Sequence, residues 1–162
     1  MAYFAVWLDG VILKIDLTDR LYQLYKGEKV PLDISYEVNE DWKSVYEIIK
    51  DKLAILSPYD ESTTKDILNN IKLEAKYIVS NKGKTKPSLE PYKLLFDLTK
   101  WDPLDVITLA SSPLDLLSAR FFDSRIKVVC IKRFRDCSRY SPFFYAENLI
   151  TAINSLKKLR YI

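Results

Sequence analysis

The sequence of 162 residues contains no histidine, the side chain that most often serves as a general base near neutral pH. Catalytic sites in which histidine activates a serine or a cysteine therefore have no base in this chain. Any chemistry would have to rely on carboxylates, on lysine or on a bound metal ion.

Cysteine is nearly absent as well, with only Cys130 and Cys137 present. They are not spaced as a C-x-x-C pair, and no histidine can join them as a metal ligand, so a structural zinc site is not expected. The sequence leaves their redox state open. We expect a reducing, cytoplasmic compartment.

Long hydrophobic runs are also missing, and no stretch approaches the ~20 residues that a membrane-spanning helix needs. The first residues lack a basic segment followed by an apolar core, so we expect neither export nor a membrane partner. The 25 basic and 22 acidic residues give a net charge of +3. This mild excess does not by itself indicate nucleic acid as a partner.

Apolar residues make up 48% of the chain, enough for the core of a single domain that spans residues 1–162. Short apolar runs alternate with segments of helical periodicity. The expected strands are 3–8, 52–57, 76–79, 106–109 and 127–131, and the expected helices are 41–50, 63–73, 91–101, 113–122 and 146–159. This alternation predicts an α/β fold, a doubly wound, Rossmann-like parallel sheet of five strands with helices on both faces. Segment 14–40 has little pattern, and we expect it to form at most a small flap in place of a cap domain.

Two motifs in the second half of the chain carry a family resemblance. Residues 86–92 read K-P-S-L-E-P-Y, and the strand that follows the next helical stretch leads into A-S-S-P-L-D at 110–115. This order resembles the haloacid dehalogenase (HAD) superfamily, in which a lysine motif precedes a strand that ends in G-D-x-x-x-D. Lys86 and Asp115 match that pattern, whereas Ala110 and Ser111 replace the glycine and the first aspartate.

The first strand carries a third part of the resemblance. It ends in W-L-D-G-V-I at 7–12, where the superfamily has D-x-D-G, with a nucleophile followed by an acid/base. Asp9 then matches the acid/base, and Trp7 occupies the position of the nucleophile, which an indole cannot replace. The alternative is a shift of two residues that makes Asp9 the nucleophile, since positions 7 and 9 face the same way on a strand.

The resemblance also assigns roles to the remaining polar residues. Ser57 ends the second strand, where a hydroxyl binds a phosphoryl oxygen, and Lys86 would offset negative charge. Asp115 would be a ligand of Mg²⁺, but Ser111 stands in place of a second carboxylate, so any metal site is incomplete. We expect no cofactor, and Mg²⁺ only if activity remains.

Three functions follow from these residues. The first is an inactive HAD-like domain, a pseudophosphatase that binds a protein partner or acts as a scaffold, with Trp7 at its binding site. The second is a weak or atypical phosphohydrolase that uses Asp9 with Ser57, Lys86 and Asp115. The third is nucleic-acid binding through segment 127–145, where basic and aromatic residues alternate. The basic side chains expected to bind a partner there are Arg133, Arg135 and Arg139.

Overall fold

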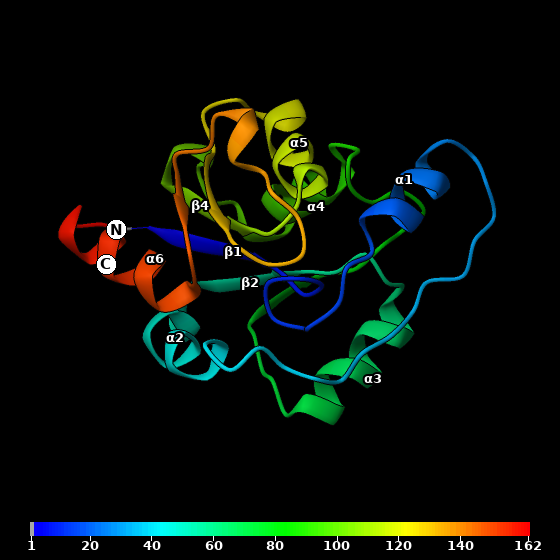
Figure 1. Ribbon diagram of the computed structural model, residues 1–162, viewed down its shortest axis with the longest axis horizontal. Coiled ribbons are helices and arrows are strands. Elements are labelled where there is room, and N and C mark those ends of the chain that lie inside the picture. Colours follow the sequence, from blue (N-terminus) through cyan, green and yellow to red (C-terminus); the bar gives the residue numbers. More distant parts are fainter. Residues whose placement is uncertain (1) are drawn as a thin grey trace.

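The computed structural model describes residues 2–162, whose strands form one parallel sheet (Figure 1). The strands are β1 (Tyr3–Trp7), β2 (Leu53–Leu56), β3 (Tyr77–Val79), β4 (Val106–Ala110), β5 (Lys127–Ile131) and β6 (Phe144–Ala146). Their order across the sheet is β3-β2-β1-β4-β5-β6, and all neighbouring strands are parallel. The predicted doubly wound α/β fold is confirmed, and β1 lies in the interior of the sheet.

The prediction of five strands misses the edge strand β6. Its three residues pair with β5 in the register Val129 to Phe144 and Ile131 to Ala146. A strand this short, inside a segment of mixed basic and aromatic residues, shows no recognisable alternation. The helix expected from residue 146 consequently begins later, at Leu149, after the side chain of Asn148 accepts a hydrogen bond from the backbone N–H of Thr151 at 2.8 Å.

Helices cover both faces of the sheet, as predicted. They are α1 (Thr18–Tyr25), α2 (Trp42–Ile49), α3 (Glu61–Ile71), α4 (Glu90–Thr99), α5 (Pro113–Phe122) and α6 (Leu149–Lys158), with 3₁₀ turns η1 (Lys50–Lys52), η2 (Pro103–Asp105) and η3 (Ser138–Tyr140). Helices α2 and α6 pack together on one face, and α4 packs with α5 on the other (Figure 1). The chain moves outward from β1 to β3 and then returns to β4, so right-handed crossovers place α2, which leads to β2, and α5, which leads to β5, on opposite faces. Within residues 2–162, no helix is both long and apolar enough to cross a bilayer.

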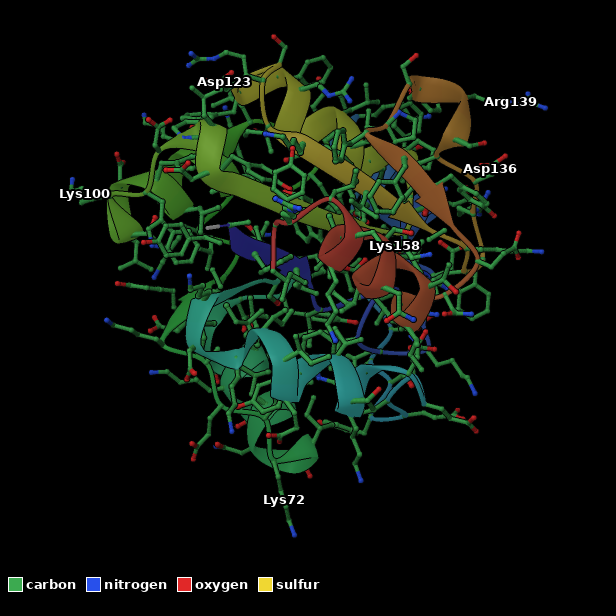
Figure 2. All side chains as sticks on the ribbon, turned by 90° about the vertical axis from the view of Figure 1, so that its left-hand side faces the viewer. Lys72, Lys100, Asp123, Asp136, Arg139 and Lys158 are labelled. Carbon is green, nitrogen blue, oxygen red and sulfur yellow. A yellow bond between two sulfur atoms is a disulfide. The ribbon has the colours of Figure 1, made fainter. Side chains whose placement is uncertain are left out.

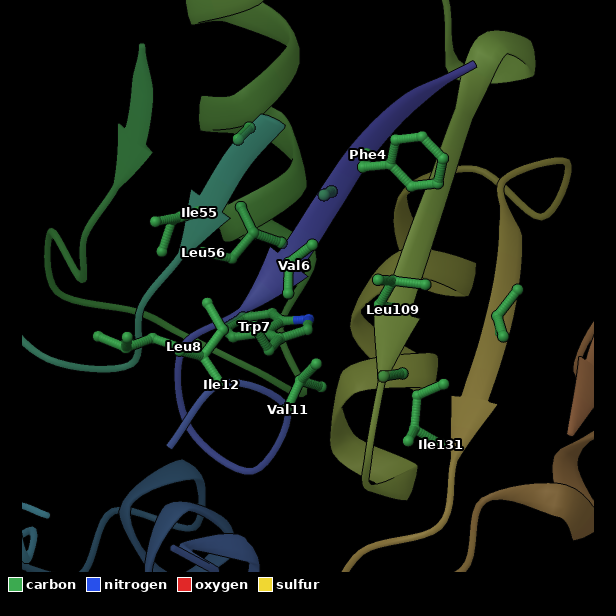
Figure 3. Packing of buried hydrophobic residues seen from close by; sticks show 14 of the residues in the cluster. Phe4, Val6, Trp7, Leu8, Val11, Ile12, Ile55, Leu56, Leu109 and Ile131 are labelled. Atoms are coloured by element: carbon green, nitrogen blue, oxygen red, sulfur yellow. The ribbon is translucent and has the colours of Figure 1, made fainter. Parts of the chain in front are cut away.

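The core continues from β1 into the turn that follows it. Val6, Trp7 and Leu8 are completely buried, and so are Val11 and Ile12 beyond the strand (Figure 3). A parallel strand in the interior of a sheet is covered on both faces, which explains the unbroken apolar run. The turn after β1 therefore belongs to the packed interior, although turns usually lie at the surface.

Gly10 allows this turn to approach β4. Its φ is +82°, and a Cβ added there would lie 2.1 Å from Ser111 Oγ. We expect Gly10→Ala to lower the free energy of unfolding by about 1–3 kcal/mol, measured by urea denaturation. Gly27→Ala is the matched control, because Gly27 also has a positive φ of +94° but nothing lies within 4 Å of its added Cβ. Equal losses in the two variants would mean that the close approach to Ser111 is unimportant.

Segment 14–40 contains α1 and is otherwise irregular apart from a single bridge between Leu13 and Val38. Its two ends are held at the turn after β1. The backbone N–H of Asn39 donates to the carbonyl oxygen of Ile12 at 2.8 Å, and the Asn39 side chain donates to the carbonyl oxygens of Gly10 and Val11, both at 3.0 Å. Both ends of the segment are thus fixed at the carboxyl end of β1.

Candidate functional site

The carboxyl end of β1 places Trp7 and Asp9 around the ammonium group of Lys86. Lys86 Nζ donates to Asp9 Oδ2 at 2.7 Å and lies 4.3 Å from the centroid of the Trp7 ring. Lys86 belongs to the loop between β3 and α4, Trp7 is the last residue of β1, and Asp9 lies two residues further along the chain. The sequence-predicted Trp7, Asp9 and Lys86 are therefore brought together.

Asp115 completes this cluster from the first turn of α5. Lys86 Nζ also donates to Asp115 Oδ1. The other carboxylate oxygen, Oδ2, accepts from the backbone N–H groups of Ser111 at 2.8 Å and Ser112 at 3.2 Å. The Ser112 side chain accepts in return from the Asp115 backbone N–H at 3.4 Å, which forms a capping box. Asp115 thus starts the helix and binds Lys86 with the same carboxylate.

The indole of Trp7 is held by a buried chain of polar groups. Its Nε1–H donates to the hydroxyl of Tyr92 at 3.2 Å, and that hydroxyl lies 3.0 Å from Thr108 Oγ1. The sequence did not predict these hydrogen bonds among Trp7, Tyr92 and Thr108. Tyr92 enters the sequence patterns only through the lysine motif and the helix that follows it. The available signal is Thr108, since it is a polar residue inside an otherwise apolar strand.

The cluster is almost closed to solvent, with Lys86 2%, Asp9 4% and Asp115 0% exposed. Burial raises the pKa of Asp9, an effect that Lys86 opposes and Asp115 reinforces. Burial alone would lower the pKa of Lys86, but the carboxylates of Asp115 and Asp9 together raise it. The lysine is therefore charged at neutral pH and is held between two acids.

Ser57 follows β2, and its side chain forms hydrogen bonds with Thr64 of α3 and with the backbone of Tyr59. Its Oγ lies 2.7 Å from Thr64 Oγ1 and accepts from the backbone N–H of Tyr59 at 3.1 Å. Thr64 Oγ1 donates to the carbonyl oxygen of Tyr59 at 3.2 Å, so the single proton of Ser57 goes to Thr64. Ser57 is engaged in closing its own turn.

Very little space remains beside the acids. The cavity lined by Asp9, Gly10, Ser111 and Arg133, among other residues, has a volume of about 10 Å³. A cavity needs roughly 10–15 Å³ of such space to hold one water molecule. The carboxyl end of β1 is therefore filled by protein.

The residues at this position do not fit a Mg²⁺ ion. Mg²⁺ requires several oxygen ligands in an octahedral arrangement, and carboxylates normally supply the compensating charge. Here the ammonium of Lys86 occupies the space between Asp9 and Asp115, and Ser111 supplies no carboxylate. Across residues 2–162, no group of three or more acidic, cysteine or histidine side chains could hold a metal ion.

Two of the three arginines expected to bind a partner contact acids of the chain itself. Arg133 pairs with Asp41 at 2.8 Å, and Arg135 pairs with Asp16 and Asp19, both at 2.7 Å. The third, Arg139, is exposed and points away from the body of the molecule (Figure 2). The basic charge of segment 127–145 is thus partly neutralised.

The loop that carries Arg133 and Arg135 is closed by a disulfide between Cys130, in β5, and Cys137. The sequence had left this pairing open. The bond limits the conformational freedom of the residues between the two cysteines. It thereby helps to keep Arg133 near Asp41 and Arg135 near Asp16 and Asp19.

The fold is that of the HAD-like hydrolases. A haloacid dehalogenase-like hydrolase from Streptococcus pneumoniae aligns with a TM-score of 0.74 and 15% identity over 96% of this chain and 98% of its own. A putative β-phosphoglucomutase from Thermotoga maritima aligns with a TM-score of 0.75 and 15% identity over 98% of this chain and 100% of its own. A predicted phosphoglycolate phosphatase from Haemophilus somnus aligns with a TM-score of 0.71 and 12% identity over 97% of this chain and 98% of its own. By sequence, neither a protein-family model nor a curated protein matches the chain. The structural comparisons thus establish a HAD-like fold.

Proposed function

We propose that this chain is a catalytically inactive HAD-like module, a single domain that binds a partner instead of hydrolysing a phosphate ester. The observation that carries the proposal is the filled site. The side chains of Trp7 and Lys86, both buried, lie at the carboxyl end of β1, and about 10 Å³ remains beside Asp9. A phosphoryl group is several times larger than a water molecule and does not fit there.

The charges support the same proposal. A nucleophilic or acid/base role for Asp9 needs a carboxylate that can approach a substrate. In this chain one oxygen of Asp9 bonds to Lys86, and the second, Oδ1, is buried without a hydrogen-bond partner among residues 2–162. Lys86 is engaged by the two acids and is not free to stabilise a phosphoryl group.

The partner that we propose is a protein, which binds through the exposed aromatic residues of the segment after β5. Phe134, Tyr140 and Phe143 are 58%, 45% and 41% exposed. Aromatic residues are enriched in protein interfaces. Nucleic acid is less well supported, because Arg133 and Arg135 are already paired with carboxylates.

The test is the hydrolysis of p-nitrophenyl phosphate in the presence of Mg²⁺ or Mn²⁺. We expect no turnover above the uncatalysed rate and no metal-dependent rise in the melting temperature, since a metal that binds the folded state would stabilise it.

Asp9→Asn is the matched control, because asparagine has nearly the same shape and can still accept a hydrogen bond from Lys86. Turnover by the natural chain that depends on metal and disappears in Asp9→Asn would overturn the proposal. Turnover that persists in Asp9→Asn would come from a contaminant and would leave the proposal in place.

A further inference from the structure

A larger groove lies on another part of the molecule. It has a volume of about 970 Å³ and is formed by α1, the loop between β3 and α4, and the end of α5. Sites for small molecules commonly have volumes of this order. Of the acid and lysine cluster only Lys86 lines the groove, and its ammonium is already bonded to two carboxylates. The groove therefore needs a polar recognition group other than Lys86.

Lys84 is that group. It is exposed at the groove, and among residues 2–162 no carboxylate lies within ion-pair distance of it. The neighbouring Lys82, by contrast, pairs with Glu61 at 3.5 Å. Thr85, next in the chain, has a buried Oγ1 without a hydrogen-bond partner in the described residues. An unpaired ammonium, followed in the chain by a hydroxyl that lacks a partner, favours an acceptor that carries negative charge.

Apolar and aromatic side chains make up much of the remaining lining. Leu21 and Leu24 of α1 line it together with Leu89, and its largest side chains are Tyr25, 59% exposed, and Phe121, 56% exposed. Exposed aromatic rings that surround a concave surface indicate a binding site. The body of a ligand that lies between these two rings would be aromatic or aliphatic.

Glu90 limits the charge of the ligand. It also lines the groove, and its carboxylate forms no ion pair within residues 2–162. Lys84 and Glu90 carry opposite charges at the same groove, and a group with a single negative charge that lies against Lys84 meets less repulsion from Glu90 than a dianion does.

We propose that this groove binds a small organic carboxylate. Lys84 and Thr85 hold the carboxylate group, and Tyr25 and Phe121 contact an aromatic or aliphatic body. The inference goes beyond the proposed function and shares with it the premise that Lys86 is not available to a ligand.

The test is a titration of the ¹⁵N-labelled protein with 2-naphthoate, followed by amide NMR shifts. We expect saturable shifts at Gly83, Thr85 and Leu24, with acetate and 2-naphthalenemethanol each binding about tenfold more weakly or less, because one lacks the apolar body and the other lacks the charge. The dianion 2-naphthyl phosphonate is expected to bind no better than 2-naphthoate.

Four variants assign the contacts. Lys84→Ala and Phe121→Ala are each expected to weaken binding of 2-naphthoate about three- to tenfold, and Glu90→Gln is expected to strengthen it. Lys82→Ala is the matched control, since Lys82 is on the same loop but faces Glu61, and it is expected to leave the affinity unchanged.

The proposal would be overturned by no saturable shifts at millimolar 2-naphthoate, by an affinity that Lys84→Ala does not change, or by tighter binding of 2-naphthylmethylammonium than of 2-naphthoate. Shifts centred on Asp9 and Ser111 would also contradict it, because they would place the ligand in the filled site. None of these results depends on phosphate hydrolysis, so failure here is distinct from failure of the proposed function.

Discussion

Replacing Lys86 by methionine is expected to lower the free energy of unfolding at neutral pH by about 3–5 kcal/mol, the range found when one partner of a buried ion pair is removed. Methionine keeps much of the length of the side chain but has no charge. Asp9 and Asp115, 4% and 0% exposed, would then lie close together without a cation between them. Urea denaturation of the natural chain and the variant measures the difference.

The same substitution is expected to change how stability depends on pH. Burial raises the pKa of Asp9 in the folded chain above its ordinary value of 3.8, and Asp115 raises it further, whereas Lys86 lowers it. Without Lys86 the two largest effects that remain, burial and the charge of Asp115, both raise the pKa, so the folded-state pKa of Asp9 rises more.

The sign of this dependence follows from proton binding. A carboxyl group whose folded-state pKa exceeds its unfolded value binds a proton more tightly in the folded state. Its contribution to stability is complete below the unfolded pKa of about 3.8 and is lost as the pH rises through the folded pKa. Lys86→Met should therefore recover stability as the pH is lowered from neutral toward the unfolded pKa of about 3.8, and should do so more steeply than the natural chain.

Two further variants separate this explanation from a general effect of losing a lysine. Lys84→Met removes an exposed lysine from the same loop and is expected to change stability by less than about 0.5 kcal/mol. Adding Asp9→Asn to Lys86→Met removes the repulsion between the two acids and should restore part of the loss. A loss below about 1 kcal/mol for Lys86→Met, or stability that falls on acidification more than in the natural chain, would contradict the buried cluster.

The site was predictable as far as the order of the strands determines it. Asp9 and Asp115 follow neighbouring parallel strands, whose carboxyl ends meet at one edge of a sheet, and the lysine motif placed Lys86 at the same edge. What could not be predicted is that Lys86 pairs with both acids. That arrangement depends on the path of the loop before α4 and on the room beside Trp7, which spacing along the sequence does not encode.

Arg133 is a clearer example of a contact that the sequence does not reveal. Within a segment rich in basic and aromatic residues it was interpreted as a surface residue that binds a partner. In the structure its side chain is only 11% exposed and pairs with Asp41, whose side chain is 13% exposed. The two residues are 92 positions apart, and the segment around Asp41 gave no signal other than a helix start. Long-range ion pairs of this kind depend on tertiary packing and leave no local pattern.

Replacing Arg133 by alanine is expected to lower the free energy of unfolding by about 3–5 kcal/mol, because the carboxylate of Asp41 would lose its cation while remaining largely buried. Arg133 makes four hydrogen bonds, to both oxygens of Asp41 and to the carbonyl oxygens of Gly10 and Val11, at 2.8–3.1 Å. It therefore joins the loop after β5 to both the turn after β1 and the start of α2. Urea denaturation measures the loss, and limited proteolysis should show faster cleavage within segment 14–40.

Arg133→Lys and Arg139→Ala are the controls for this prediction. Lysine keeps the charge but cannot reproduce the planar fork that reaches the carboxylate and the two carbonyl groups together, so Arg133→Lys should recover only part of the lost stability. Arg139 is exposed on the same loop region, and Arg139→Ala should change stability by less than about 0.5 kcal/mol. Equal stability of Arg133→Ala and Arg139→Ala would mean that Arg133 remains free at the surface, where it could bind a partner as the sequence suggested. A large loss confined to Arg133 would assign this arginine to joining the loop after β5 to the turn after β1 and the start of α2.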